Sequence, residues 1–277
     1  MNVGPNPNEI VIDDGNWRQF AQDIVLDGEV KSRGCIPRDY TVKYATSQAL
    51  DIPLIPRSEW SARIKEMEET KSRLSDIRNR GMYGQQIPSR DQNGRGYCWM
   101  HSGCSAALLL RARDNQPYVD LSAYMGACII KNYRDEGGWG AQGLDWLVQN
   151  GLPSSEFWPQ RSVSRSNDTP AMRENAKLHR VAEAWNDLSL PQYSRNLTFD
   201  QVMTCLLCRI PVIVDFNWWS HSVCAADPVE VEPGSFGIRI WNSWGDSWSD
   251  AGMGILRGSK AIPDGASAPR VAMAATV

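Results

Sequence analysis

The chain of 277 residues contains no apolar stretch close to the roughly 20 residues that a membrane-spanning helix needs. Its net charge is only −3 and no basic run exceeds a few residues, so nothing indicates a nucleic-acid partner. The first eight residues have neither the charged region nor the apolar core of a secretory signal. We therefore expect a protein that neither enters a membrane nor binds nucleic acid and that carries no secretory signal.

Histidines and paired cysteine motifs are also scarce. The chain has three histidines, and Cys205 and Cys208 form its single CxxC spacing. That pair lies in an apolar helical segment without a second CxxC or a nearby histidine pair, so we expect neither a metal site nor a redox role there. No glycine-rich phosphate loop is present either, and we expect no cofactor.

The stretch from Asp91 to Ala107 carries the strongest chemical pattern. A loop with two glycines leads into Cys98 and Trp99, and small and apolar residues suited to a helix follow. A cysteine at a helix start lies at the positive end of the helix dipole, which favours the nucleophilic thiolate. Gln92, six residues earlier, can fold its side-chain amide back over the sulfur. That amide and the backbone N–H of Cys98 would form a two-donor oxyanion hole.

This segment resembles the active-site segment of papain-like cysteine peptidases, whose histidine and asparagine lie roughly 130–150 residues after the cysteine. Here His221 follows Cys98 by 123 residues and Asn242 follows it by 144. Asn242 opens an Asn-Ser-Trp-Gly sequence similar to that of the family. Residues 137–152 resemble the double glycine, short helix and turn of its substrate-binding wall. Three motifs in the family's order over residues 86–258 carry the resemblance.

The resemblance implies a role for each motif residue. Cys98 would be the nucleophile, His221 the general base and acid, and Asn242 the group that orients the imidazole. Gln92 would complete the oxyanion hole, and Trp244 would shield the contact between His221 and Asn242 from water. Each signal has a structural alternative, because a lone cysteine is more often a small buried side chain. The Asn-Ser-Trp-Gly sequence could likewise be only a turn between strands.

The resemblance also implies a substrate-binding surface. Gly137 and Gly138 would let a peptide lie close enough to pair backbone to backbone, although two glycines in a loop are common. The family's main specificity pocket is lined by positions that Trp139 and Trp219 occupy here. Two indoles would narrow it, which predicts a restricted preference or poor activity on substrates with a bulky P2 residue (the second residue before the scissile bond).

Two positions depart from the family pattern. His101 lies one helical turn after Cys98, where the family usually has a bulky apolar residue. We expect it to pack with one polar contact, with an effect on the thiolate as the alternative. Ser220 replaces the Asp or Asn common before the histidine, so a secondary polar contact is expected to be missing. The third histidine, His179, lies in a charged helical run and is expected at the surface.

The order of predicted elements favours an α+β, papain-like two-lobe fold. Helices are expected at 98–113, 122–134, 140–149 and 170–185, and strands at 210–216, 236–241 and 252–256. A helical left lobe (about 86–185) would then face a β-barrel-like right lobe (about 186–260) across a cleft. An N-terminal extension over 1–85 contains a helical arm at 58–80, and 261–277 is a C-terminal tail. The arm is expected to pack on its own domain or on a partner, with inhibition of the cleft as an alternative.

The cysteines indicate a reduced protein. Where the family has a bridged cysteine just before the nucleophile, this chain has Arg95 and Gly96. Cys128 falls at another commonly bridged position, but Asp135 occupies the position of its partner. We therefore expect a cytoplasmic or otherwise intracellular protein, with the interior of a virion as a special case.

The sequence thus predicts a cysteine peptidase that hydrolyses a peptide or protein substrate through a Cys98 thioester. The alternative hypothesis is a papain-fold structural or binding subunit of a larger assembly, such as a viral particle, with weak or no activity. The composition of both chain ends motivates it, because such ends fray unless a partner holds them. Acyl or amide transfer to an amine is a third, weaker reading of the same residues.

Overall fold

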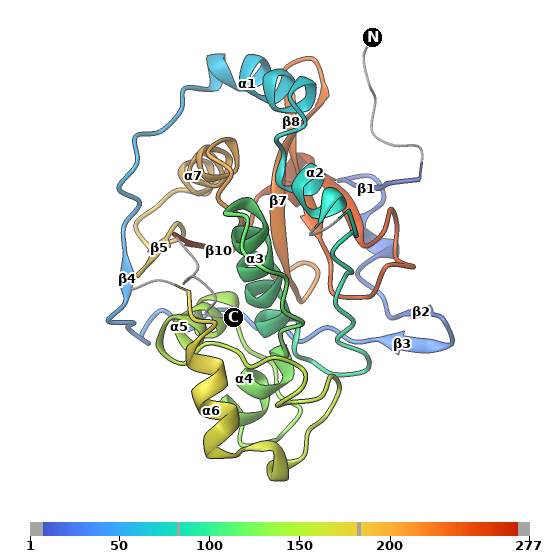
Figure 1. Ribbon diagram of the computed structural model, residues 1–277. Coiled ribbons are helices and arrows are strands. Elements are labelled where there is room, and N and C mark those ends of the chain that lie inside the picture. The colour runs from blue at the N-terminus through green and yellow to red at the C-terminus, as the bar shows by residue number, and fades with distance from the viewer. Residues whose placement is uncertain (1–7, 82–83, 182–183, 271–277) are drawn as a thin grey trace.

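The computed structural model describes residues 8–81, 84–181 and 184–270 (Figure 1). Its main sheet consists of β1 (Ile10–Ile12), β4 (Ser47–Gln48), β5 (Trp185–Asp187), β6 (Val212–Phe216), β7 (His221–Glu232), β8 (Ser235–Trp241), β9 (Met253–Arg257) and β10 (Gly265–Pro269). The strand order is β1-β9-β8-β7-β6-β10-β5-β4. Neighbours are antiparallel except at the two edges, where β1 runs parallel to β9 and β4 parallel to β5.

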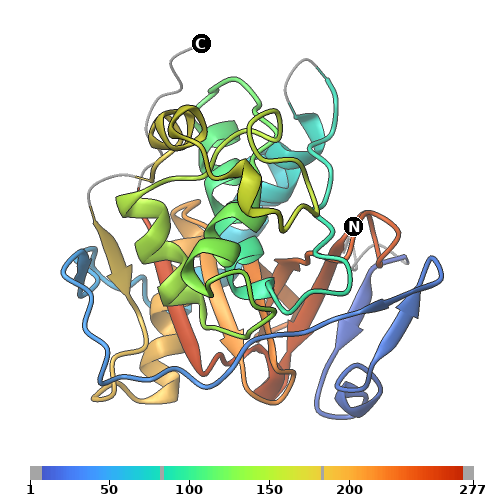
Figure 2. The same cartoon turned by 90° about the horizontal axis from the view of Figure 1, so that it is seen from below.

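A separate antiparallel pair, β2 (Ile24–Leu26) and β3 (Glu29–Lys31), precedes the helices. Asp27 and Gly28 join the two strands, and both have positive φ, as a two-residue hairpin turn requires. Figure 2 shows the chain after β3 crossing the view in blue, from this hairpin toward the opposite side of the molecule, where β4 lies.

The helices are α1 (Arg57–Glu69), α2 (Leu74–Arg80), α3 (Cys98–Arg113), α4 (Ala123–Ile130), α5 (Gly140–Gln149), α6 (Pro170–Lys177) and α7 (Arg195–Leu207). The helices predicted at 98–113 and 140–149 are confirmed as α3 and α5. The one predicted at 170–185 ends early as α6, because the chain enters the sheet as β5 at Trp185. None of the helices in the described parts is long and apolar enough to cross a membrane.

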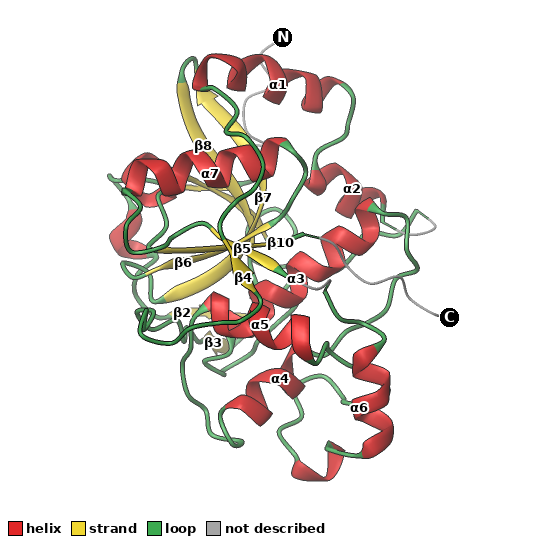
Figure 3. Ribbon diagram, turned by 90° about the vertical axis from the view of Figure 1, so that its left-hand side faces the viewer, coloured by secondary structure: helices red, strands yellow, loops and turns green. Residues whose placement is uncertain are grey.

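The central helix α3 is buried along most of its length and packs on β7 and α5 (Figures 1 and 3). Its small residues make this possible. A side chain at Gly103 would stand 2.6 Å from a methyl carbon of Leu147 on α5, so glycine lets the two helices approach without displacing that methyl group. The helix start, where Cys98 lies, is thereby held rigidly against the sheet.

Two hydrophobic clusters lie on opposite faces of the sheet. Neighbouring residues on one strand point to opposite faces, and Ile213 joins the cluster around α3 to α5, whereas Val212 and Val214 join the other. The second cluster contains buried side chains of α1 and α7, including Trp60 and Ile64. Helices on both faces of one mixed sheet confirm the α+β class.

The helical arm predicted at 58–80 forms two helices instead of one. Lys71 has a φ of 53°, a left-handed conformation that stops α1 without the glycine usually found at such a position. No glycine or proline marks the break, so the sequence pattern gave no sign of it.

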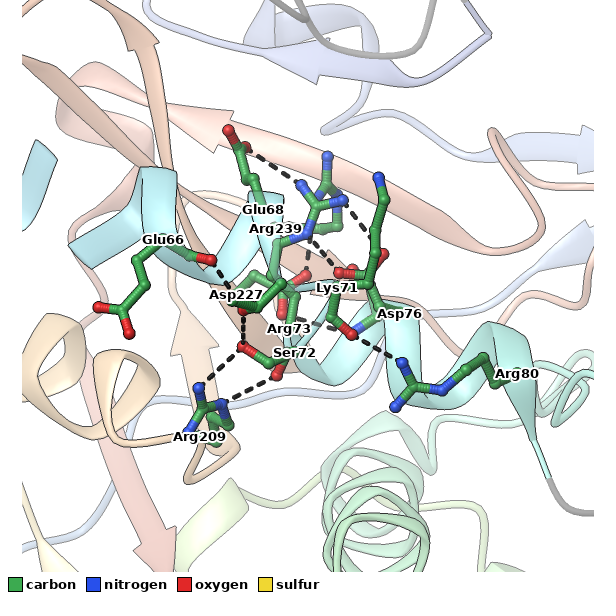
Figure 4. Close-up of polar contacts among 12 residues, drawn as sticks. Glu66, Glu68, Lys71, Ser72, Arg73, Asp76, Arg80, Arg209, Asp227 and Arg239 are labelled. Carbon is green, nitrogen blue, oxygen red and sulfur yellow. Dashed lines mark hydrogen bonds and ion pairs between the residues drawn. The ribbon is translucent and has the colours of Figure 1, made fainter. Parts of the chain in front are cut away.

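Polar contacts fix the link between α1 and α2 to the rest of the domain (Figure 4). Arg209, which follows α7, donates to the Ser72 carbonyl at 3.0 Å and to its hydroxyl at 2.8 Å. Arg73 pairs with Glu68 at 3.1 Å and with Asp76 at 2.9 Å. The arm therefore packs on its own domain.

The tail predicted from residue 261 onward is in part wrong. Residues 265–269 form β10, which lies between β6 and β5 within the sheet. Small side chains such as Gly265 and Ala266 suit a strand buried on both faces, although their Ala, Pro and Ser composition reads as a tail. Residues 271–277 lie outside the described part of the chain.

Candidate active site

Cys98 is the first residue of α3, and its side chain is completely buried. Burial raises the pKa of the Cys98 thiol to about 12. Backbone hydrogen bonds with Ser222 and Gly34 favour the thiolate and lower the pKa, but by less than burial raises it. The contact with Ser222 is informative, because this residue directly follows His221. It places the sulfur beside the start of β7.

His221 and Asn242 come from neighbouring strands and meet directly. The imidazole Nε2 lies 2.7 Å from the Asn242 side-chain oxygen. Trp244 stacks on the imidazole at 4.7 Å between ring centroids, and Trp219 approaches the same ring edge-on at 4.9 Å. Burial lowers the pKa of His221 to about 3, so the ring is neutral. Its Nδ1 has no hydrogen-bond partner in the described part of the chain.

Gln92 is buried and fixed from three sides. Its backbone N–H donates to the Ser243 carbonyl at 2.9 Å, and its side-chain oxygen accepts from the Ser243 hydroxyl at 2.6 Å. Its side-chain nitrogen donates to the carbonyls of Arg95 at 2.8 Å and Ser32 at 2.9 Å. The Asn-Ser-Trp-Gly segment thus positions the glutamine, and both glutamine N–H groups point at carbonyl oxygens.

Ser32 belongs to a segment that covers these residues, residues 31–36, which we call the strap. Besides Gln92, the indole N–H of Trp244 donates to the Ser32 carbonyl at 3.2 Å. Cys35 donates its backbone N–H to the Ser220 carbonyl at 3.0 Å. With the strap in place, the side chains of Cys98, His221 and Asn242 are wholly buried.

The strap pairs with the double-glycine segment as an extra strand would. The Gly138 N–H donates to the Gly34 carbonyl and the Ile36 N–H donates to the Gly138 carbonyl, both at 2.9 Å. These two bonds form a parallel bridge between Cys35 and Gly138. An added side chain at Gly138 would stand 2.6 Å from the Trp99 ring, and one at Gly34 would stand 2.0 Å from the Gly96 carbonyl oxygen. Glycine is required on both sides of this contact.

A salt bridge anchors the start of the strap. The Lys31 ammonium is almost completely buried and lies 2.9 Å from a carboxylate oxygen of Asp91. Arg33, two residues on, pairs with Asp23 at 2.7 Å. Side chains and backbone together hold the strap over the start of α3.

The two tryptophans predicted at the specificity pocket have other partners in this covered form. The Trp139 indole donates to the Tyr44 hydroxyl at 2.8 Å. The Trp219 indole donates to the Phe20 carbonyl at 2.9 Å and its ring stacks on Trp218. Their role in substrate choice stays a prediction.

The other two histidines are both buried. His101 lies edge-on to Tyr124, and burial lowers its pKa to about 3. Neither of its ring nitrogens has a hydrogen-bond partner among the residues described, so the predicted polar contact is absent. The surface position predicted for His179 is wrong, because only 5% of the residue is exposed. Helix α6 ends at Lys177, and the chain then turns inward toward β5.

Sequence reasoning missed the strap and one carboxylate beneath it, Asp215 on β6. The strap has no periodic pattern, and its position depends on contacts of its backbone with residues 60 or more positions away. Asp215 did leave a signal, since it is the single charged residue within an otherwise apolar strand from Val212 to Phe216.

Comparisons with known proteins agree with this geometry. No protein-family model matches the chain. Zingipain-1 from Zingiber officinale is 23% identical over 182 residues, which is 61% of this chain and 81% of that protein. The structure of xylellain, a cysteine protease from Xylella fastidiosa, has a TM-score of 0.56 at 16% identity and covers 90% of this chain and 99% of its own. Digestive procathepsin L 3 from the larval midgut of Tenebrio molitor has a TM-score of 0.52 at 16% identity, covering 78% of this chain and 90% of its own.

The fold is papain-like, with a central helix that starts at a cysteine and a sheet that supplies a histidine and an asparagine. The resemblance to the papain-like (C1) cysteine peptidase family, inferred from three sequence motifs, is confirmed.

Proposed function

We propose that this chain is a cysteine peptidase that hydrolyses peptide bonds through a Cys98 thioester and that the strap holds it inactive. One observation carries the proposal: the 2.7 Å contact between His221 and Asn242, next to a cysteine at a helix start. Gln92, held by Ser243 beside the same helix start, supplies an amide donor. These positions support the roles proposed for the four residues.

In the uncovered form, the reaction follows from these positions. Water that enters with the strap displaced lowers the cost of charge, so Cys98 and His221 form a thiolate and imidazolium pair. The thiolate attacks the substrate carbonyl, and Gln92 and the Cys98 backbone N–H bind the oxyanion. His221 then protonates the leaving amine and activates the water that cleaves the thioester. Asn242 keeps the imidazole in plane throughout.

In the covered form, the same residues are inactive. Burial is the largest cause of both the raised pKa of Cys98 and the lowered pKa of His221. The proton therefore stays on sulfur, and the neutral thiol is a poor nucleophile. The Gln92 amide is also occupied, because the Ser32 carbonyl accepts one of its hydrogen bonds.

The covered site also favours a second candidate, a papain-fold binding or structural subunit with no turnover. Its supporting observation is that all three triad side chains are wholly buried while the strap lies over the start of α3. The two candidates differ in whether the strap leaves, since a permanently covered Cys98 would have no chemical use.

Labelling of the full-length chain with a peptidyl epoxide, measured by intact mass, distinguishes the peptidase from the binding or structural subunit. A Cys208→Ser background removes the one cysteine that is exposed among those described. We expect slow single labelling that Cys98→Ala abolishes and that Lys31→Ala accelerates, because the strap loses its buried anchor. Lys177→Ala removes an exposed Lys–Glu pair elsewhere and is the matched control. No Cys98-dependent labelling in any form would favour the binding subunit.

A further inference from the structure

Asp215 lies beneath the strap and has an incomplete set of partners. It is only 5% exposed. One carboxylate oxygen, Oδ2, accepts from the Gly140 N–H at 2.8 Å. The other, Oδ1, is buried and meets no charged donor and no donor in good hydrogen-bond geometry within the described chain, although the Ser222 hydroxyl and the Cys35 thiol lie close enough to lower the pKa of the carboxyl. A buried carboxylate oxygen without a donor is costly, so its presence calls for a ligand that the covered form does not contain.

The side chain that faces Asp215 is that of Cys35. Burial and the nearby carboxylate of Asp215 together raise the pKa of the Cys35 thiol well above its ordinary value. The Cys35 backbone is the part of the strap that bridges to Gly138. Asp215 therefore lies next to the side chain that sits beside Gly138, and in the covered form this side chain is a short neutral thiol.

Arg38, two residues after the strap, places a positive charge near Asp215. Arg38 binds Asp187 through two hydrogen bonds of 3.0 and 2.6 Å, and its charge also favours the ionised form of Asp215. Asp187 is 1% exposed, so two buried carboxylates depend on a cation from residues just after the strap. Burial nevertheless raises the pKa of Asp215 to about 6, and it outweighs the hydrogen bonds from Ser222 and Gly140 and the charge of Arg38.

We propose that Asp215 selects substrates with a lysine or arginine at P2, the side chain that takes the place of Cys35 beside Gly138. The inference rests on the proposed peptidase function and names its substrate class. An ammonium or guanidinium group gives Oδ1 the charged donor that it lacks. An apolar side chain of similar size would leave the buried carboxylate unpaired and would bind less well.

A double-mutant cycle tests the pairing without any need for catalysis. Cys35→Lys and Cys35→Met place side chains of similar length, one charged and one neutral, against residue 215 in the full-length chain. With Asp215 present, we expect Cys35→Lys to unfold at the higher urea midpoint. In an Asp215→Asn background that advantage should disappear. An equal difference between the two variants in both backgrounds would overturn the proposal.

Labelling rates test the same preference on the substrate side. The probes are peptidyl vinyl sulfones with either arginine or citrulline at P2, which have nearly the same shape but differ in charge. In full-length Lys31→Ala, Cys208→Ser protein, we expect Cys98 to react at least about tenfold faster with the arginine probe. Asp215→Asn should bring the ratio close to one.

The outcomes separate the two proposals. Equal rates with both probes, dependent on Cys98, would overturn the basic preference and leave the peptidase proposal standing. No reaction of Cys98 with either probe would overturn the peptidase proposal. In that case the double-mutant cycle alone decides whether Asp215 pairs with a basic side chain.

Discussion

Two parts of the N-terminal extension are held in different ways. The strap is fixed by hydrogen bonds of its backbone to Gly138, Ser220 and Gln92 and by the Lys31 salt bridge at its start. Residues 57–80 instead insert large side chains into the domain, with Trp60 and Arg78 completely buried. Burial of large apolar side chains gives much more stability than a few hydrogen bonds that water can replace. We therefore expect the strap to leave without unfolding of the protein and the arm to leave only when the protein unfolds.

This difference changes how the extension can be tested. Removing residues 1–85 would remove β1 and β4 from the two edges of the sheet and Trp60 from a core cluster. Loss of labelling in such a truncated protein would report unfolding. Point changes in the full-length chain distinguish the strap from the arm more clearly.

Trp60→Ala should have the largest effect. The indole is fully buried in the cluster with α7, and its N–H donates to the Ile55 carbonyl at 2.9 Å. Loss of a buried aromatic side chain costs about 3–5 kcal/mol, which urea unfolding measures. Phe157→Ala, at a position that is 39% exposed, is the control. A Trp60→Ala protein as stable as the wild type but with rapid Cys98 labelling would contradict this difference between the strap and the arm. It would make α1 part of the inhibitory segment.

Asp215→Asn should change how stability depends on pH. Well below pH 3.8, Asp215 is protonated whether the chain is folded or unfolded, so the wild-type and variant proteins should have similar stability. As the pH rises toward 6, the unfolded carboxyl ionises first and the wild-type protein loses stability. The pKa of Asp215 is 3.8 in the unfolded chain and about 6 in the folded one. Above pH 7 this difference makes the Asn variant more stable than the wild-type protein by about 3 kcal/mol at most. Identical curves for both proteins from pH 4 to 8 would argue against a buried, under-partnered carboxylate.

Lys31→Ala should affect access more than stability. It removes a buried ammonium paired with Asp91, which keeps a second partner in Arg161 at 2.9 Å. We expect a loss of about 1–2 kcal/mol in strap closure, and hence labelling of Cys98 about five- to thirtyfold faster. Unfolding measured by circular dichroism should stay cooperative. An unchanged labelling rate would mean that the backbone bonds alone hold the strap.

Arg63→Ala should have the smallest effect. Arg63 and Glu59 form an exposed pair one turn apart on α1, at 2.7 Å. Such pairs contribute about 0.3–0.5 kcal/mol, so both the urea midpoint and the Cys98 labelling rate should be nearly those of the wild-type protein. A large change in labelling would show that the outer face of α1 takes part in strap closure.

The sequence predicted those features that depend on local pattern or on short motifs. The helix starting at Cys98 was predictable from its apolar and small residues, and the resemblance pointed to the pairing of His221 with Asn242. Features that depend on distant partners were not predictable. β1 finds its partner β9 more than 240 residues away, and β10 has the composition of a tail. The break at Lys71 depends on a backbone conformation that lysine rarely adopts.

The strap is tied down on both sides, because β1 and β4 form the two opposite edges of the sheet. A displaced strap therefore cannot diffuse away and stays at an effective concentration of about millimolar near the site. Under the proposed function, a substrate would compete with that concentration each time it binds, so inhibition by an intact strap would be fast, reversible and independent of protein concentration. A single cut between the two anchors would end this advantage, since the freed ends could then move apart.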